Sequence, residues 1–215
     1  MICNLSLTYL QIIWIIAVVL VISVAVFLII YIPRRNKRVK SDYKYFYYKY
    51  IYKVAMDNDY YLINNFLFKI DDSYVGRIDH ILFGNKYIYI INDSYFDGDI
   101  DGKENDKSII LINRAGKKIY SDNPLLANQK LLKRLSIITG IDATLMVGVC
   151  LINNDCQCGV RTSSKSSYIV QAKKFKALVK AIESRDIGDI NKEQLANAVK
   201  AIDKLNRRNR NSGKK

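Results

Sequence analysis

The first 33 residues of the chain contain no charged side chain, and this stretch limits what the N-terminus can fold into. From Leu10 to Ile32 the sequence is apolar except for Gln11 and Ser23. As a helix, this run extends about 34 Å, which exceeds the roughly 30 Å hydrocarbon core of a bilayer. A core helix of a soluble domain is usually shorter and keeps a polar face, and a cleaved signal peptide normally has a basic segment before its apolar run. The sequence therefore predicts a transmembrane anchor over residues 1–33.

A cluster of basic residues follows the apolar run directly and consists of Arg34, Arg35, Lys37, Arg38 and Lys40. Positive charges beside a membrane span usually stay on the cytoplasmic side. The pattern predicts a single-pass protein of the cell membrane, with a very short N-terminus outside and the C-terminal domain in the cytoplasm. Anionic lipid headgroups attract such a cluster, so we expect the membrane surface to be a partner.

The net charge of +14 is concentrated at the two ends of the soluble part. Residues 33–53 contain eight basic side chains and one acidic side chain, and residues 204–215 contain six basic side chains and no acidic one. The segment between them, 54–203, carries 20 basic and 19 acidic residues. A domain that tracks a nucleic-acid backbone usually presents a basic face, so nucleic acid is a weaker expectation here than lipid. The sequence indicates no particular protein partner.

Two short runs rich in β-branched and aromatic residues, Arg77–Phe83 and Tyr87–Asn92, predict a β-hairpin. The glycine-containing Gly84-Asn85 turn joins them, and an aspartate, Asp79, lies on the first strand. Because strand side chains alternate between faces, Asp79 and the neighbouring His80 should point to opposite sides of the sheet. Asp93 should likewise point away from Asn92 and Ser94.

This region resembles the nuclease-related domain (NERD) family within the restriction-endonuclease-like group. The resemblance depends on Ile78-Asp79-His80, on the spacing to Gly102, and on Asn123-Pro124 with Gln129 further along the chain. It implies a mixed α/β fold and a site in which Asp79 and a glutamate hold a divalent cation while a lysine activates water. Counted back from Gly102, Asn92 occupies the glutamate position and Ser94 the lysine position. The resemblance also implies that the Gln129 side chain projects toward the active-site cleft.

The two replacements predict that the site is catalytically degenerate. One carboxylate holds Mg²⁺ poorly, and Ser94 offers no cation. We therefore expect no cofactor and a role in binding nucleic acid or a partner at the membrane. One alternative is an active Mg²⁺-dependent DNA or RNA nuclease, in which a strand bulge turns Asp93 toward Asp79 and a cation such as Lys86 assists. A second alternative is a membrane-proximal protein-interaction module.

The remaining sequence predicts one α/β domain, with a mixed β-sheet flanked by helices, behind the anchor. The predicted order is a basic, aromatic-rich juxtamembrane helix over residues 34–57, a NERD-like domain over 58–206, and a basic disordered tail over 207–215. Expected strands, besides the hairpin, are Tyr60–Lys69, Ile109–Asn113, Thr144–Ile152 and Tyr168–Val170. Expected helices are Ser41–Met56, Pro124–Thr139, Lys173–Glu183 and one that starts at Asn191.

Three further motifs have more ordinary explanations. The run Asp97–Gly102 matches the first half of a calcium loop, but Ser108 stands where a bidentate glutamate is required, so a surface turn is expected. His80, the only histidine, is expected to be a hydrogen-bonded packing residue. Cys150, Cys156 and Cys158 lack the second pair of ligands that a zinc site needs, so free thiols are expected.

Overall fold

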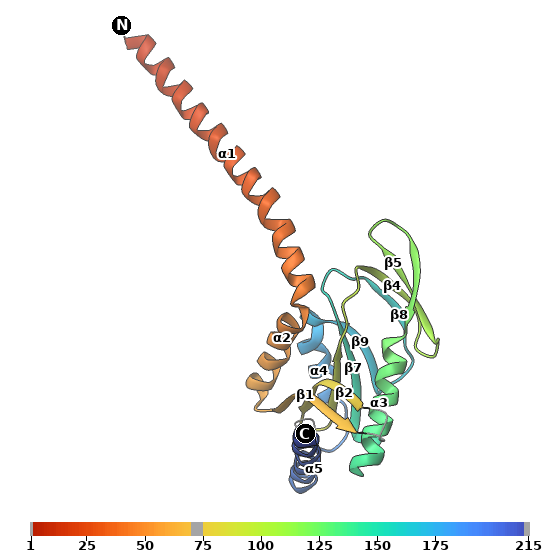
Figure 1. Cartoon of the computed structure of the whole chain (residues 1–215). Helices are drawn as coiled ribbons and strands as arrows, with labels where there is room; N and C mark the ends of the chain where they lie inside the picture. Colours follow the sequence, from red (N-terminus) through yellow and green to blue (C-terminus); the bar gives the residue numbers. More distant parts are fainter. Residues whose placement is uncertain (1, 70–74, 213–215) are drawn as a thin grey trace. The chain divides into compact units, whose positions relative to one another are not determined.

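The computed structural model describes residues 2–69 and 75–212, and the chain divides into two units at Tyr43 and Lys44 (Figure 1). The first unit consists of helix α1 (Ile2–Ser41). Within α1, Gln11–Arg34 is long and apolar enough to cross a membrane, and none of its residues is buried. The helix continues past residue 33, where the sequence placed its end. Pro33 removes one N–H donor and crowds the preceding turn, but the Arg- and Lys-rich segment that follows favours a helix, and α1 continues to Ser41.

Helix α2 (Tyr43–Asn58) opens the second unit and replaces the single juxtamembrane helix predicted over residues 34–57. Its buried residues, Tyr47, Ile51, Val54 and Ala55, recur at helical spacing on one face. Residues 34–41 belong to α1 instead. The aromatic-rich helix expected from Ser41 to Met56 is confirmed, with its start and end each shifted by two residues.

A five-stranded sheet forms the centre of the second unit. The sheet combines antiparallel and parallel strand pairs. Its strand order is β1 (Tyr61–Lys69), β2 (Val75–Phe83), β3 (Ile88–Asp93), β7 (Met146–Ile152) and β9 (Ser167–Gln171). The predicted hairpin is β2–β3, closed by a hydrogen bond from the Gly84 amide to the Tyr87 carbonyl oxygen at 2.9 Å. Every residue of β7 is buried, as expected for an apolar strand covered on both faces.

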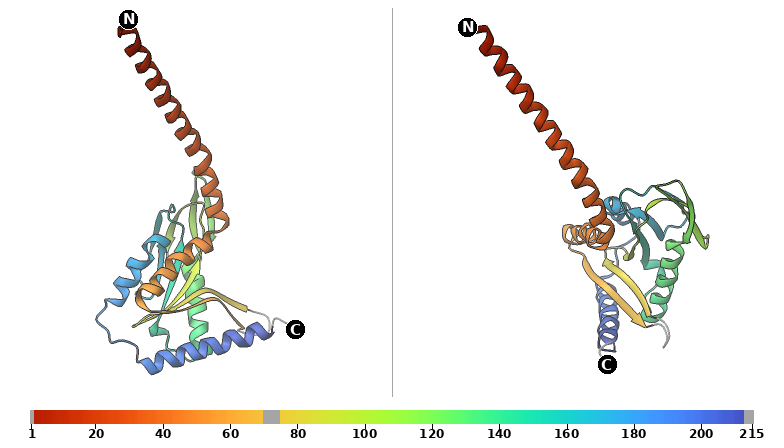
Figure 2. Two further views of the ribbon diagram at one scale, coloured as in Figure 1. Left: turned by 90° about the vertical axis from the view of Figure 1, so that its left-hand side faces the viewer. Right: turned by 45° about the horizontal axis from the view of Figure 1, so that its top comes forward.

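Helices cover both faces of this sheet. Helices α3 (Pro124–Thr139) and α5 (Lys192–Ser212) pack against one face, where Ile81 and Ile90 join a core cluster with Leu132 and Ile202. The other face meets α2 and α4 (Phe175–Glu183); for example, the Tyr89 hydroxyl donates to Glu183 at 2.7 Å. Figure 2 shows α5 as the lowest layer of the second unit. The predicted mixed α/β fold class is confirmed.

A second sheet lies beside the first, and the sequence predicted only one of its strands. Its order is β6 (Lys118–Asp122), β5 (Ser108–Asn113), β4 (Gly98–Lys103) and β8 (Cys158–Arg161). The expected surface turn over Asp97–Gly102 is wrong, because this segment forms β4 and pairs with β5 on one side and β8 on the other. Gly98 and Gly102 have φ angles of 150° and 153°, which residues with a Cβ rarely adopt.

The predicted caps of α3 are confirmed. The Asn123 side chain accepts a hydrogen bond from the Leu125 amide, Pro124 occupies the first turn, and Gly140 closes the helix with a left-handed φ of 70°. Of the disordered tail predicted over residues 207–215, residues 207–212 are helical, because α5 runs to Ser212, and residues 213–215 lie outside the described residues. No proline or glycine occurs between Lys192 and Ser212 to stop the helix earlier.

Cys150 and Cys156 are buried free thiols in a cluster with Phe96, Ile100 and Ile109 that joins the two sheets. Burial raises the pKa of both thiols to about 12. Both thiols are therefore protonated at neutral pH, and a protonated thiol is a poor nucleophile. Their position indicates a packing role. Cys158 is an exposed free thiol on β8.

Asn123 is expected to stabilise the second unit more than an ordinary helix cap does. The residue is buried, and its amide nitrogen also lies within 3.0 Å of the carbonyl oxygens of Lys103, Glu104 and Asp106. Asn123→Ala should lower the free energy of unfolding by about 2–3 kcal/mol, because it removes a helix cap together with the buried amide that bonds the carbonyl oxygens of the preceding loop. The matched control is Asn191→Ala, which removes the exposed bond from the Glu193 amide and should cost about 1 kcal/mol.

Urea unfolding of the full chain in detergent, followed by tyrosine circular dichroism, measures the free energy of unfolding of both variants. Equal losses would contradict this role.

Candidate functional site

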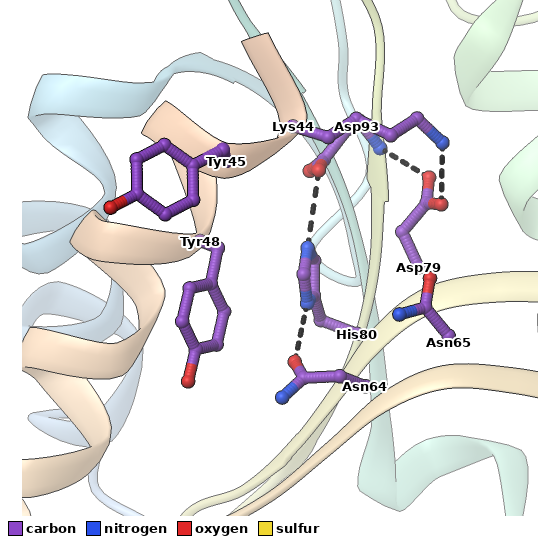
Figure 3. A pocket seen from close by; sticks show the side chains of 8 residues that line it. All are labelled: Lys44, Tyr45, Tyr48, Asn64, Asn65, Asp79, His80 and Asp93. Carbon is purple, nitrogen blue, oxygen red and sulfur yellow. Dashed lines mark hydrogen bonds and ion pairs between the residues drawn. The ribbon is translucent and has the colours of Figure 1, made fainter. Parts of the chain in front are cut away.

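A cavity of about 290 Å³ opens between the start of α2, the middle of strands β1 and β2, and the end of β3 (Figure 3). Its walls combine a cation, two acids, a histidine, two amides and two tyrosines. The residues come from α2, β1, β2 and β3, and they are Lys44, Tyr45, Tyr48, Asn64, Asn65, Asp79, His80 and Asp93. All of them lie in the second unit.

The backbone around Asp79 is interrupted on both sides of strand β2. Toward β1, the register includes the pairs on either side of Asp79 but omits the pair with Asn65, whose φ of 53° is left-handed. Toward β3, the ladder ends at the pair between His80 and Ile91. A left-handed asparagine in a strand is an uncommon conformation that a structure maintains only with support from its surroundings.

Side chains replace the missing backbone partners. The Asp79 amide donates to Asn92 Oδ1 at 3.2 Å, and the Asp93 amide donates to Asp79 Oδ2 at 3.0 Å. Strands β2 and β3 therefore separate at this point while their polar groups remain satisfied. This separation exposes the Asp79 carboxylate to the cavity.

Two cations balance the charge of Asp79. Lys44 Nζ lies 2.7 Å from Asp79 Oδ1, and Arg77 Nε lies 3.4 Å from the same oxygen. The Asp79 side chain is only 10% exposed, whereas those of Lys44 and Arg77 are 44% and 55% exposed. A carboxylate so far from water requires a partner, and Lys44 supplies it.

Neutral groups occupy the positions expected for the family's second acid and lysine. Asn92 donates through Nδ2 to Asn128 Oδ1 at 2.9 Å, and Asn128 in turn donates to the Ile90 carbonyl oxygen at 3.1 Å. Ser94 contacts the Cys150 thiol through its hydroxyl group, and its carbonyl oxygen accepts from Tyr47. Neither residue brings charge to Asp79.

Asp93 points to the other side of strand β3, away from the Asp79 carboxylate (Figure 3). Its Oδ2 lies 3.1 Å from His80 Nε2, and His80 Nδ1 lies 2.6 Å from Asn64 Oδ1. The Tyr48 ring stacks on His80 with centroids 6.2 Å apart. Burial raises the pKa of Asp93, and the charge of Asp79 adds to this effect, whereas the bond to His80 opposes it. Asp93 Oδ1 is buried without a hydrogen-bond partner.

These residues do not fit the Mg²⁺ ion of a metal-dependent nuclease. Mg²⁺ requires near-octahedral oxygen ligands and is usually held by one or two carboxylates. One Asp79 oxygen contacts Lys44, the other contacts the Asp93 amide, and the second acid faces His80. Within residues 2–69 and 75–212, no three His, Cys, Asp or Glu side chains are grouped to hold a metal ion.

The structure brings together only part of the predicted site. Asp79 and Asn92 are hydrogen-bonded neighbours. Gln129 is half-buried and does not line the cavity, while Asn128, one position earlier, contacts Asn92. Lys86 lies elsewhere, because its ammonium group donates to the Arg185 carbonyl oxygen at 2.6 Å.

Lys44 is the main residue that the sequence reasoning missed. It lies on the buried side of α2, three and seven positions before Tyr47 and Ile51. A lysine among the apolar positions of a helix is a usable signal, because such a charge needs an acidic partner. The sequence does not reveal which acid that partner is.

Comparison with known proteins gives a family match and a distant similarity to a solved structure. A model of the nuclease-related domain family matches residues 45–153, a range that includes every cavity residue except Lys44. The crystal structure of AF1548, a protein of unknown function, matches with 9% sequence identity and a TM-score of 0.31. That match covers 62% of this chain and 54% of the other, so this chain spans about half of that protein's length. No curated protein matches the chain.

The raised pKa of Asp93 predicts how stability changes with pH. The folded chain binds the Asp93 carboxyl proton more tightly than the unfolded chain. The stability that this proton contributes is therefore fully present below the ordinary pKa of 3.8. It is lost as the pH rises through the folded pKa. Asp93→Asn cannot titrate, so its stability relative to wild type should improve as the pH rises from about 4 to about 7. Urea unfolding across this range tests the sign. The control is Asp122→Asn at an exposed position on β6, and the idea fails if the Asp93→Asn and wild-type curves stay parallel.

Proposed function

The chain belongs to the nuclease-related domain family, and we propose that it is a membrane-anchored member that binds nucleic acid without cutting it. The observation that carries this proposal is the ion pair between Lys44 and Asp79. A tethered ammonium group contacts the one carboxylate on this side of β3, and neutral Asn92 stands beside it. Metal-assisted cleavage needs a metal ion that stabilises the attacking and leaving oxygens. In this arrangement no second carboxylate stands beside Asp79 to help hold such an ion.

Membrane anchoring is supported by the apolar helix and its charge pattern. Gln11–Arg34 is long enough to span a bilayer, and basic residues follow it immediately. The positive-inside rule then assigns the second unit to the cytoplasmic side of the cell membrane. Anionic lipid headgroups are the partner that suits these charges.

The cavity offers suitable contacts for one nucleotide unit. Lys44 lines the cavity and Arg77 contacts the same Asp79 oxygen from outside the lining, and both keep further donors for a phosphate. Tyr45 and Tyr48 line the same cavity and provide ring faces for a base. Because residues 54–203 are nearly neutral, we expect few phosphate contacts and a shallow dependence of affinity on salt.

One observation favours the competing nuclease hypothesis. Lys44 and Asp93 line the same cavity as Asp79 and are the lysine and second acid that an active site would use. For this to work, Asp93 would have to leave His80 and turn to the other side of β3. The protein-interaction hypothesis requires neither cleavage nor nucleic-acid affinity.

The first test is cleavage. Purified full chain in detergent should leave plasmid and single-stranded DNA and RNA intact in Mg²⁺ or Mn²⁺, at the background rate of Asp79→Asn. Fluorescence anisotropy should detect binding of a labelled single strand under the same conditions. Metal-dependent cleavage that Asp79→Asn abolishes would establish the nuclease. Absence of both cleavage and binding would leave the interaction module.

The second test concerns Lys44. Lys44→Gln should weaken single-strand binding uniformly across sequences and reduce the slope of log affinity against log salt by about 0.7, the value for one lost contact to a single strand. Lys86→Gln is the matched control, since the ammonium group of Lys86 is bonded to the Arg185 carbonyl oxygen away from the cavity. Identical slopes for the two variants would remove Lys44 from the interface.

A further inference from the structure

Helix α2 has an exposed aromatic and basic face opposite its buried one. Tyr45, Lys49, Tyr52 and Met56 follow one another at spacings of four, three and four residues, which aligns them on one side of a helix. Tyr45, Tyr52 and Met56 are 57%, 46% and 64% exposed. We call these four residues the α2 stripe.

The stripe combines the chemical groups that suit a membrane interface. Tyrosine rings prefer the headgroup level of a bilayer, and lysines beside them attract anionic lipid. Lys49 Nζ lies 4.6 Å from the centroid of the Tyr45 ring, so cation and ring face the solvent together. Lys53 is exposed beside the stripe. Asp57, the nearest acid at the end of the helix, is paired with Lys176 at 2.6 Å.

Chain connectivity keeps the stripe close to the bilayer if Gln11–Arg34 is inserted. The seven helical residues 35–41 follow Arg34 and extend about 10 Å, and α2 starts at Tyr43. The headgroup region extends some 5–8 Å beyond the hydrocarbon core on each side. The start of α2 is therefore held within reach of the interface by the covalent chain alone.

We propose that the α2 stripe docks on the anionic membrane surface and gives the second unit a second attachment beside the transmembrane helix. The inference rests on the proposed membrane anchoring and is independent of whether the cavity binds or cuts nucleic acid. Lipid suits the stripe better than nucleic acid because Met56 and the tyrosine rings require an apolar layer beneath the charged one. Docking also places the cavity mouth at the membrane surface, since Tyr45 belongs to both.

Tryptophan quenching in nanodiscs tests this attachment in the full chain. The native chain has a single tryptophan, Trp14, within the apolar helix. A Trp14→Phe background with Tyr52→Trp then reports on the stripe alone, and Tyr120→Trp in the same background is the control, since Tyr120 is 79% exposed on β6. The discs contain phosphatidylcholine with or without phosphatidylserine, and the acyl chains are brominated near their carbonyl end.

The expected result is quenching of the native Trp14 in all discs, and quenching of the Tyr52→Trp indole when phosphatidylserine is present. The Tyr120→Trp indole should remain unquenched. Lys49→Gln and Lys53→Gln should each lower the ratio of docked to undocked domain about fivefold.

The other outcomes overturn specific parts of the inference. Quenched Trp14 with an unquenched Tyr52→Trp indole rejects the stripe and leaves the anchoring intact. Unquenched Trp14 rejects the anchoring and the inference with it. A blue shift of the Tyr52→Trp emission without quenching means that protein covers the stripe, which also rejects lipid docking.

Discussion

The ion pair between Lys44 and Asp79 is the interaction on which the candidate site depends. Asp79 lies where the sheet ladder is broken on both sides, so its carboxylate and amide obtain partners from side chains and from neighbouring strands. A mostly buried carboxylate without a cation would be strongly destabilising. Lys44 satisfies it by connecting the start of α2 to the middle of β2. The charge balance that a metal ion would provide is thus part of the fold itself.

Local chemistry explains which elements the sequence predicted well. The Gly84-Asn85 turn, the Asn123 and Gly140 caps and the continuous apolar run of β7 each specify their structure within a few residues. The second sheet is different, since β6 and β8 are short strands that are mostly exposed. Their pattern resembles that of loops. The Asp- and Gly-rich β4 is a strand because β5 and β8 pair with it, and this tertiary effect overrides local turn propensity.

The site could be predicted where strand alternation alone decides it. The alternation of strand side chains correctly places Asp79 and Asn92 on one face of the sheet and His80 and Asp93 on the other. Asp93 bonds to His80, and no strand bulge turns it toward Asp79. Prediction failed where helices supply the side chain. On α3 a shift of one residue turns the side chain by about 100°, which is the difference between Gln129 and Asn128. Lys44 is 35 residues from Asp79, so their contact depends on how α2 packs and is invisible in local pattern.

Helix α2 links the chemistry of the cavity to the surface of the molecule. One side of the helix supplies Lys44 to Asp79 and Tyr48 to His80, and the adjacent side carries the α2 stripe, with Tyr45 lining the cavity as well. A rigid helix cannot rotate one side without moving the other. A surface that holds the stripe therefore also restrains the position of the ammonium group at Asp79. Conversely, a ligand that draws Lys44 away from Asp79 acts on the same helix that carries the α2 stripe. If the stripe docks on a membrane as proposed, binding at the cavity and docking of the domain are thermodynamically coupled.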